Sequence, residues 1–444
     1  MDNIKNSDII IVGGGVLGTS LAYWLSNNNL NLKIAIIEQE KNIAMHSTGR
    51  NTGVYHSPFY LDPIKKKRFA SAAYDSYRLW KKLAIEYNLP WKEWGTLEIA
   101  QRDEDLKEID KYAEWASKNG LEDDDFEILS KDEIKKIEPH AIGEGAFFSR
   151  KDASVDYKIM TEKIMDISVR KGVNLISGYK VKNIYNKSNK LNVYIEDHNK
   201  NKIQISTDLM FNCAGGESLK IAHKMGYAKN FSQLNFRGDY WIIKDKFPHI
   251  NTNIYTIPRH SKFPFLDPHF IKRFNGLREI GPNASLVHSP YSYEGDPGLL
   301  KSILFGINGM PLYPKLKLLT NKEFMNIVRS EWRSSINKNQ MCNRVSSFLP
   351  ELDSSYLSGK GTSGIRSPLI SKTGFVSDAT IIKDEHSIHI LNYNSPGASG
   401  APAFSFSLIQ ELINEGVFNK REVIFSNSNI WSSDNVMYSN SSTS

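Results

Sequence analysis

Cysteine is scarce in this chain of 444 residues, which contains only Cys213 and Cys342. Neither has the paired spacing of a metal-binding motif, so a disulfide framework and a cysteine-rich zinc site are excluded, and a reducing, cytoplasmic compartment is expected. Uninterrupted apolar runs are also lacking, because the charge-free residues 9–32 are broken by glycines at positions 13–15 and 18. Such glycines are typical of a strand, a tight turn and a helix rather than of a membrane span.

Charge of one sign does not dominate either, since 56 Lys and Arg residues face 49 Asp and Glu residues, for a net charge of +7. With 40% hydrophobic and 11% aromatic residues the chain can build a large core, which excludes a disordered protein. The length indicates two or three domains or one large composite fold. The basic excess suits an anionic substrate or membrane surface, whereas no RNA-binding module or regular basic and aromatic pattern points to nucleic acid.

Residues 8–38 have the pattern of a nucleotide-binding βαβ unit, with strands expected at 8–12 and 33–38 and a helix at 17–25. Gly13, Gly15 and Gly18 have the GxGxxG spacing, and Glu38 ends the second strand about 20 residues later. The glycines allow a diphosphate to approach the helix N-terminus, and Glu38 can accept hydrogen bonds from ribose hydroxyls. The unit predicts dinucleotide binding but does not choose between NAD and FAD.

Beyond this unit, helices and strands alternate without an internal repeat. Further helices are expected at residues 69–80, 103–119, 156–170, 299–348 and from about 401. Strands are expected at residues 91–101, 172–177, 181–185, 191–197 and 208–216, the last of which ends in a glycine turn. Tyr, Phe and Pro are dense at residues 237–280, which indicates a second, mostly antiparallel region.

The most specific motif is SxGRNxGVxH, which reads here as Ser47, Gly49, Arg50, Asn51, Gly53, Val54 and His56. Shorter motifs are EP at 138–139, VDY at 155–157, FRGDY at 236–240, FPFLDPH at 263–269, GPNA at 281–284 and SP at 395–396. In these motifs the chain resembles the FAD-dependent oxidoreductases of the D-amino-acid-oxidase superfamily, and most closely the L-2-hydroxyglutarate dehydrogenase/oxidase family. The likeness extends from residue 8 to about residue 413.

The resemblance implies an α/β (α+β composite) fold, in which a Rossmann-like FAD-binding domain is joined to a substrate domain built on a mostly antiparallel β-sheet. The FAD-binding domain would be discontinuous, with residues 1–85, 150–225 and 360–420. The substrate domain would take residues 86–149 and 226–359. The Ser- and Asn-rich residues 426–444 are expected to form a mobile tail.

The resemblance also implies noncovalent FAD. Its expected contacts are Gly13, Gly15, Val16, Leu17, Gly18, Glu38, Ser47, Arg50, Asn51, Gly53, Val181, Ala214, Gly215, Ser395, Pro396, Gly397, Ala398 and Ser399. Val181 is expected beside the adenine. The helix after residues 395–399 would direct its positive N-terminus at the pyrimidine edge of the flavin. No metal site is predicted.

Oxidation of an alcohol to a ketone needs a base that takes the hydroxyl proton while hydride leaves to the flavin. His56 and His269 are the candidate bases, because imidazole titrates near neutral pH and both lie in the resembling motifs. Which of the two acts stays open. Side chains that could bind a substrate carboxylate are Arg237, Arg273 and Arg366 as clamps, and Tyr240 and Tyr255 as hydrogen-bond donors.

The expected function is FAD-dependent oxidation of an L-2-hydroxy dicarboxylic acid, foremost L-2-hydroxyglutarate to 2-oxoglutarate, with electron transfer to a quinone or another acceptor. A malate:quinone oxidoreductase and an amine or amino-acid oxidase are alternatives from the same superfamily. A flavin-binding protein without turnover is an alternative of another class. The basic residues 65–68 are interpreted as a solvated helix face or as a peripheral contact with the inner face of an anionic membrane.

Overall fold

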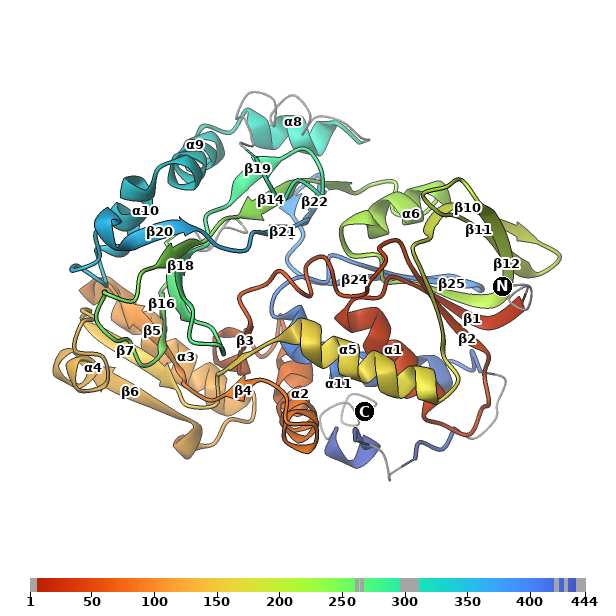
Figure 1. The fold of residues 1–444 in the computed structure, drawn as a ribbon, viewed down its shortest axis with the longest axis horizontal. Coiled ribbons are helices and arrows are strands. Elements are labelled where there is room, and N and C mark those ends of the chain that lie inside the picture. Colours follow the sequence, from red (N-terminus) through yellow and green to blue (C-terminus); the bar gives the residue numbers. More distant parts are fainter. Residues whose placement is uncertain are drawn as a thin grey trace.

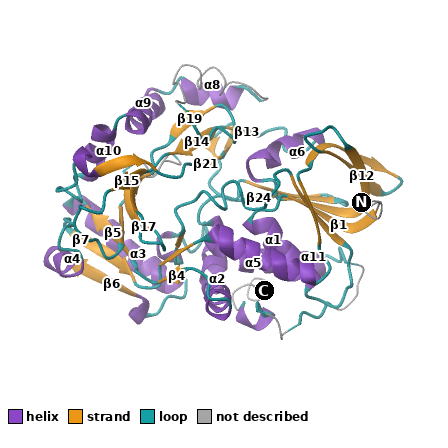
Figure 2. Ribbon diagram, in the orientation of Figure 1, coloured by secondary structure: helices purple, strands orange, loops and turns teal. Residues whose placement is uncertain are grey.

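The computed structural model describes residues 6–259, 263, 267–295, 311–418, 423–426 and 430–436. These residues form two large sheets, each with its own helices, and three small three-stranded sheets (Figure 1). Helices and strands are interspersed along the chain (Figure 2). The predicted α/β (α+β composite) class is therefore confirmed.

The first large sheet has a parallel core in the order β9-β2-β1-β12-β25. Its parallel strands are β1 (Asn6–Val12), β2 (Ile34–Glu38), β9 (Asn174–Ser177), β12 (Lys202–Asn212) and β25 (Ser387–Leu391). Antiparallel strands β10 (Lys180–Lys187), β11 (Lys190–Glu196) and β24 (Thr380–Lys383) extend it. Every residue of β2 is buried, as is typical of a parallel strand that is covered on both faces.

Helices cover both faces of this sheet. On one face lie α1 (Val16–Ser26), α2 (Lys67–Glu86), α5 (Tyr157–Arg170) and α11 (Gly397–Asn414). Helix α1 contacts α5 and α11, and α11 packs along α2 (Figure 1). On the other face, α6 (Ser218–Lys224) and the β10–β11 hairpin share a core with β1 and β2.

The second large sheet has the order β20-β15-β18-β17-β16-β5-β7-β6 and is antiparallel except for the β5–β16 pair. Its strands are β5 (Thr96–Ala100), β6 (Phe126–Ser130), β7 (Gly145–Ser149), β15 (Trp241–Ile243), β16 (Asn253–Thr256), β17 (His269–Lys272), β18 (Arg278–Gly281) and β20 (Leu357–Lys360). Helices α3 (Leu106–Lys118), α4 (Lys131–Ile137) and α10 (Lys338–Val345) pack against it. The expected mostly antiparallel sheet is thus present.

The three small sheets and two further helices complete the described elements. The sheets are β3-β8-β4 (Val54–Tyr55, Ala153–Val155, Trp91–Lys92), β19-β14-β21 (Ser285–Val287, Asn235–Gly238, Gly364–Arg366) and β13-β22-β23 (Ser232–Gln233, Leu369–Ser371, Gly374–Phe375). The helices are α8 (Tyr313–Leu319) and α9 (Lys322–Ile336). No helix in the described ranges is both long enough and apolar enough to cross a membrane.

Several boundaries differ from the sequence prediction. The strand expected at 91–101 is two strands, because Gly95 between them has φ +74. The helical region 299–348 is divided into α8, α9 and α10, and its residues 299–310 lie outside the described residues. The last helix begins at Gly397 rather than near residue 401, so the small residues before Ala401 form its first turn instead of a loop.

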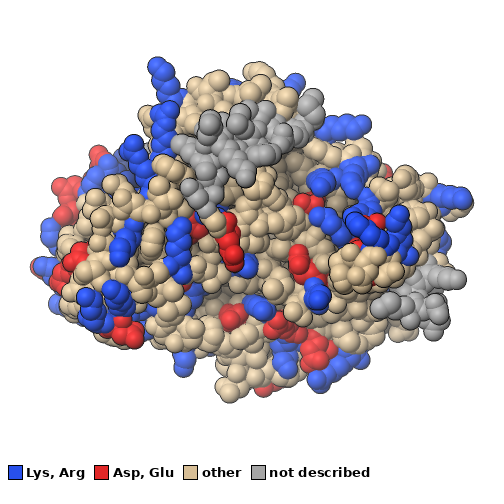
Figure 3. All heavy atoms as spheres, turned by 45° about the horizontal axis from the view of Figure 1, so that its top comes forward, with Lys and Arg blue, Asp and Glu red and all other residues tan. Residues whose placement is uncertain are grey.

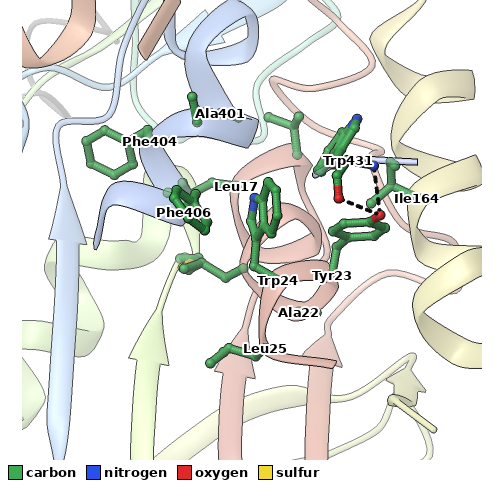
Figure 4. Packing of buried hydrophobic residues seen from close by; sticks show 14 of the residues in the cluster. Leu17, Ala22, Tyr23, Trp24, Leu25, Ile164, Ala401, Phe404, Phe406 and Trp431 are labelled. Atoms are coloured by element: carbon green, nitrogen blue, oxygen red, sulfur yellow. Dashed lines mark hydrogen bonds between the residues drawn. The ribbon is translucent and has the colours of Figure 1, made fainter. Parts of the chain in front are cut away.

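The C-terminal segment also differs from the expected mobile tail. Trp431 is fully buried, its indole N–H donates to the Leu79 carbonyl at 3.0 Å, and its backbone N–H donates to the Tyr23 hydroxyl at 2.9 Å. Figure 4 shows Trp431 beside Tyr23 and Ile164 in the core of the first sheet. Residues 430–436 are therefore part of the packed structure, whereas 427–429 and 437–444 lie outside the described residues.

Candidate active site

A cavity of about 650 Å³ is lined by both halves of the molecule. The first sheet contributes the β1–α1 turn, the end of β2 and part of β10, and the other side contributes β14, β21 and Tyr240. This volume lies within the roughly 300–1,000 Å³ that is usual for small-molecule and cofactor sites. Of the predicted cofactor contacts, those that line the cavity are Gly13, Gly15, Val16, Leu17, Glu38, Ser47, Arg50, Asn51, Val181, Ala214, Gly215, Ser395, Pro396, Gly397, Ala398 and Ser399.

The glycine turn after β1 brings the backbone close to this cavity. Gly13 has φ +112, and a Cβ there would lie 2.4 Å from the Cys213 carbonyl oxygen. A Cβ at Gly18 would lie 2.1 Å from the Gly13 carbonyl oxygen, so Gly18 packs α1 onto the turn behind the cavity wall. Helix α1 begins at Val16 without an acidic residue in its first turn, so its N-terminus suits a diphosphate.

Glu38 is 7% exposed, and its carboxylate is held at the edge of the glycine turn. Its Oε2 accepts from the backbone N–H of Gly14 at 2.8 Å, and its Oε1 accepts from that of Glu40 at 2.9 Å. Each carboxylate oxygen has a further lone pair, so Glu38 can also accept from the hydroxyls of a ribose. Val181 lies on the same wall and is 8% exposed.

Lysines surround the nucleotide side of the cavity. Figure 3 shows Lys and Arg side chains gathered over α6 and β10. Four of these lysines line the cavity: Lys180, Lys182, Lys220 and Lys224. Their charge is offset in part by Glu217, which lies 3.5 Å from Lys180 and 3.7 Å from Lys220, and the remaining positive potential suits an anionic dinucleotide.

The segment between Ser47 and Gly53 is a compact loop held by its own hydrogen bonds. The Asn51 amide donates to the Thr48 carbonyl at 2.9 Å, and the Asn51 Oδ1 accepts from the Gly53 N–H at 2.8 Å. Ser47 Oγ donates to the Ile365 carbonyl at 3.2 Å, which ties the loop to β21. Gly53 itself lies behind the wall, because a Cβ there would be 2.7 Å from the Val155 carbonyl oxygen.

The first turn of α11 closes another side of the cavity. Ser399 Oγ accepts from the His56 backbone N–H at 3.1 Å and lies 3.0 Å from the Tyr157 hydroxyl. The Trp80 indole N–H is shared between the carbonyls of Ala398 and Ser399 at 3.2 and 3.1 Å. This turn has no acidic residue, so the N-terminus of α11 can stabilise negative charge in the cavity.

His56 lines the cavity and is oriented by Asp152, a residue that the sequence did not single out. The imidazole Nδ1 lies 2.9 Å from Asp152 Oδ2, and the Nε2 lies 3.3 Å from the Tyr255 hydroxyl. Asp152 is fully buried, and its Oδ1 accepts from the Ser57 N–H and the hydroxyls of Ser57 and Ser149 at 2.7–2.9 Å. Because a carboxylate only accepts, Nδ1 is the donor and Nε2 carries the lone pair, as a general base requires.

His269 lies behind this pair instead of on the cavity wall. It is 1% exposed, and its ring stacks on Tyr255 with 4.0 Å between centroids. Nδ1 lies 3.2 Å from the Asp267 carbonyl oxygen, and the buried Nε2 has no partner among the described residues. Burial holds the pKa of His269 well below the usual value, so the ring is neutral.

Among the three predicted arginines, only Arg366 lines the cavity. Its guanidinium makes no hydrogen bond or ion pair with the described residues, and burial lowers its pKa although nearby Tyr240 opposes this. Arg273 is bound instead to Glu279 at 2.6 Å and to the Asn51 carbonyl at 2.9 Å. Arg237 is 1% exposed and paired with Asp239, so neither Arg273 nor Arg237 is placed on the cavity wall, and both contact protein segments.

The two predicted tyrosines are placed differently. Tyr240 lines the cavity, is 3% exposed, and has a pKa that burial raises, so its hydroxyl is a neutral donor. Tyr255 lies between His56 and His269 and does not line the cavity, but it packs against Val54 and Tyr240, which do. In the described part of the chain no three His, Cys, Asp or Glu side chains are grouped to hold a metal ion.

Comparison with known proteins agrees with this geometry. The family described as "FAD dependent oxidoreductase" matches residues 8–406. A protein of Caenorhabditis briggsae named L-2-hydroxyglutarate dehydrogenase, mitochondrial, is 30% identical over 420 residues, with 91% of this chain and 93% of the relative covered. A protein of Indibacter alkaliphilus named L-2-hydroxyglutarate dehydrogenase is 28% identical over 396 residues, with 88% and 95% covered.

Solved structures share the fold. The dithionite-reduced L-α-glycerophosphate oxidase of Mycoplasma pneumoniae with FAD bound aligns with a TM-score of 0.71 at 19% identity, covering 95% of this chain and 97% of that one. The glycine oxidase of Geobacillus kaustophilus aligns with a TM-score of 0.66 at 13% identity, covering 96% and 97%. At such identities the likeness establishes the architecture alone.

Proposed function

The chain belongs to the family of FAD-dependent oxidoreductases, and on this premise we propose that it oxidises L-2-hydroxyglutarate to 2-oxoglutarate. The names of the relatives suggest this substrate. The observation that carries the proposal is the presence on the wall of one cavity of an oriented base, His56, and of Arg366, whose guanidinium has no partner among the described residues. In the oxidation of a 2-hydroxy acid, removal of the hydroxyl proton and binding of the carboxylate are the two tasks that fall to protein side chains, while the flavin accepts the hydride.

FAD supplies the hydride acceptor when it is bound. His56 Nε2 takes the hydroxyl proton, and the Asp152 carboxylate keeps the other proton on Nδ1 and stabilises the resulting imidazolium. The Tyr255 hydroxyl lies 3.3 Å from Nε2, so a substrate hydroxyl that binds Nε2 would have to replace this contact. Arg366 binds a substrate carboxylate through its two parallel N–H groups, and Tyr240 donates a further hydrogen bond.

For the cofactor, we assign the diphosphate to the N-terminus of α1, the ribose to Glu38 and the adenine to the wall at Val181. The loop from Ser47 to Asn51 and residues 395–399 would surround the flavin, noncovalently. We assign residues 1–85, 150–225 and 360–420 to the FAD-binding domain, and residues 86–149 and 226–359 to the substrate domain. The placement of the two large sheets supports this division.

Anaerobic titration of the purified holoprotein tests the substrate. Flavin absorbance should bleach with L-2-hydroxyglutarate and remain with D-2-hydroxyglutarate, L-malate, glycine, L-proline and L-α-glycerophosphate. Bleaching by L-malate would replace the proposal with a malate oxidoreductase, and bleaching by an amino acid would replace it with an amino-acid oxidase. A flavin that no compound reduces would favour a binding protein without turnover.

For the electron acceptor, we propose a quinone reached through peripheral membrane contact at the start of α2. Ile64 is 86% exposed, and the neighbouring Lys65 and Lys67 are exposed, whereas Arg68 is paired with Glu411 at 3.0 Å. Exposed apolar and basic residues together suit an anionic lipid surface. Substrate-dependent reduction of a soluble quinone, and cosedimentation with anionic vesicles that is lost in Lys65→Glu/Lys67→Glu, would support the proposal. Cosedimentation that the variant retains would contradict the contact.

A further inference from the structure

Residues 289–294, here called the strap, follow shortly after β19, and Pro290, Tyr291 and Tyr293 of the strap line the side of the cavity that is proposed to hold the nucleotide. The strap contacts residues that belong to the first sheet and its loops. The Tyr291 hydroxyl donates to Gln39 Oε1 at 3.0 Å, and the Tyr293 hydroxyl lies 2.9 Å from His46 Nδ1. The strap therefore joins the part of the chain that carries β19 to the β2 end, where Glu38 is placed for the ribose.

Both tyrosine rings of the strap are packed against cations that line the same cavity. The Arg50 guanidinium lies 4.2 Å from the centroid of the Tyr293 ring, and Lys180 Nζ lies 5.1 Å from that of Tyr291. The His46 ring stacks on Tyr293 with 5.8 Å between centroids. Tyr291 and Tyr293 line the cavity together with Glu38 and Val181, so the rings form a wall of the proposed nucleotide site.

The buried guanidinium of Arg237 holds the strap in place. Arg237 Nη1 donates to the carbonyls of Ser292 and Glu294 at 3.3 and 3.0 Å, while its Nε lies 2.9 Å from Asp239 Oδ1. Asp239 is itself 1% exposed and accepts from the hydroxyls of Ser363, at 2.7 Å, and Ser335. A buried ion pair is costly unless its remaining donors are satisfied. Here the strap carbonyls accept from Nη1 and Asp239 Oδ2 accepts from Nη2 at 3.3 Å, whereas Nε makes no hydrogen bond with the described residues.

We propose that the strap is a clasp that retains the bound dinucleotide by closing the nucleotide side of the cavity, and that Arg237 is the positioning residue that holds it closed. The inference rests on the FAD site assigned above, and not on the identity of the substrate. Tyr291 and Tyr293 supply the contact with the dinucleotide. Arg237 acts through Ser292 and Glu294, without touching the ligand.

Release of FAD from the holoprotein tests the clasp. Free flavin is more fluorescent than bound flavin, so dilution of the holoprotein gives the dissociation rate directly. Tyr291→Ala/Tyr293→Ala should raise this rate by about tenfold or more, because two ring contacts are lost. Tyr313→Ala is the matched control, since Tyr313 is 62% exposed on α8 and does not line the cavity. A dissociation rate within twofold of wild type in the double variant would overturn the clasp.

A mutant cycle tests the positioning role. Arg237→Gln should raise FAD release in the wild-type background and have no further effect in the Tyr291→Ala/Tyr293→Ala background, because the strap is then already lost. Additive effects would show that Arg237 acts elsewhere. If Arg237→Gln fails to fold, Ser363→Ala, which removes one donor to Asp239, replaces it in the cycle. A protein that retains FAD through the strap but fails to oxidise L-2-hydroxyglutarate would refute the proposed function alone.

Discussion

The sequence offered two histidines, His56 and His269, as candidates for the general base, and their surroundings in the structure differ. His56 has a buried carboxylate on Nδ1 and a lone pair on Nε2 at the cavity, whereas His269 is stacked on Tyr255 and enclosed. The depressed pKa of His269 does not by itself prevent proton uptake, but its Nε2 is buried and His269 does not line the cavity. The geometry therefore favours His56, although the role of either residue stays a prediction.

Replacement of His56 or its partner should slow the chemical step. His56→Ala and Asp152→Asn should each lower the anaerobic rate of flavin reduction, by about 100- to 10,000-fold for the loss of a general base. Asp152→Asn preserves shape but presents a donor where His56 needs an acceptor. Stopped-flow absorbance of the FAD-loaded variants measures this rate. Wild-type rates in both variants, with a slow His269→Ala, would reassign the base to His269.

We expect Arg366 to contribute to the affinity for the substrate, and Arg366→Lys tests this. Lys at this position keeps the charge but loses the planar pair of donors, so the substrate concentration at half-maximal flavin reduction should rise by about tenfold while FAD content is unchanged. Arg333→Lys, on the exposed side of α9, is the control. An unaltered half-saturation in Arg366→Lys would exclude a clamp at this position and leave Tyr240 as the principal polar contact.

At the scale of elements, the sequence was sufficient to predict those elements that are encoded by residues close together in the chain. The βαβ unit and its glycine turn are confirmed, because the strand, turn and helix signals lie within residues 8–38. The FAD cofactor, which the resemblance and not this unit implied, is confirmed by the family match. Asp152 could not be found this way, since its contact with His56 spans 96 residues and leaves no spacing to recognise. The surroundings of Arg237 could not be predicted for a related reason: FRGDY places it two residues before Asp239, but its contacts with the carbonyls of Ser292 and Glu294 span more than 50 residues.

The β12–β25 pair supports a prediction about pH. His389 in β25 is fully buried, accepts from the Asn212 amide at Nδ1 at 3.0 Å, and has a pKa that burial lowers to about 4. In the unfolded chain His389 takes up a proton near its ordinary pKa of 6.5, whereas in the folded chain it stays neutral down to about pH 4. The contribution of neutral His389 to the free energy of unfolding is therefore complete above pH 6.5 and is lost as the pH falls toward 4. Each pH unit in that window removes about 1.4 kcal/mol.

Urea unfolding between pH 7 and pH 4.5 measures this effect. His389→Gln should show a smaller acid-side decline in the free energy of unfolding than wild type. Buried His269, whose pKa is also lowered, contributes a decline in the same direction, so His269→Gln combined with His389→Gln should flatten the profile further. Exposed His198→Gln is the control. Equal slopes in His389→Gln and wild type would contradict the assigned neutral state of His389.

At the scale of the whole molecule, the first and last described segments share one hydrophobic core, which contains Ile9 of β1 and Trp431. Composition predicted a mobile tail for residues 426–444, because Ser and Asn are frequent there. Burial of the single Trp431 nevertheless anchors residues 430–436 in the core, although the residues around it are polar. Trp431 packs against Tyr23 of α1 and against Trp80 of α2, with 4.8 and 5.2 Å between ring centroids. The last described segment thus covers the helical layer that supports the nucleotide-binding turn (Figure 4).

Replacement of Trp431 should destabilise the part of the molecule that is built on the first large sheet. Trp431→Ala should lower the free energy of unfolding by about 3–5 kcal/mol, as expected for truncation of a large buried aromatic residue. In the variant the backbone of residue 431 can still hydrogen-bond to the Tyr23 hydroxyl, but the indole ring that packs on Tyr23 is lost. Helix α1 should therefore be less firmly packed, and FAD should be released at a lower temperature. Thermal unfolding followed by circular dichroism and by flavin fluorescence measures both effects.

Val417→Ala, at a position that is 38% exposed shortly after α11, is the control and should change stability by less than about 1 kcal/mol. A wild-type melting temperature in Trp431→Ala would show that the segment covers the core without stabilising it, and chain truncation after residue 426 would then be tolerated as composition alone suggests.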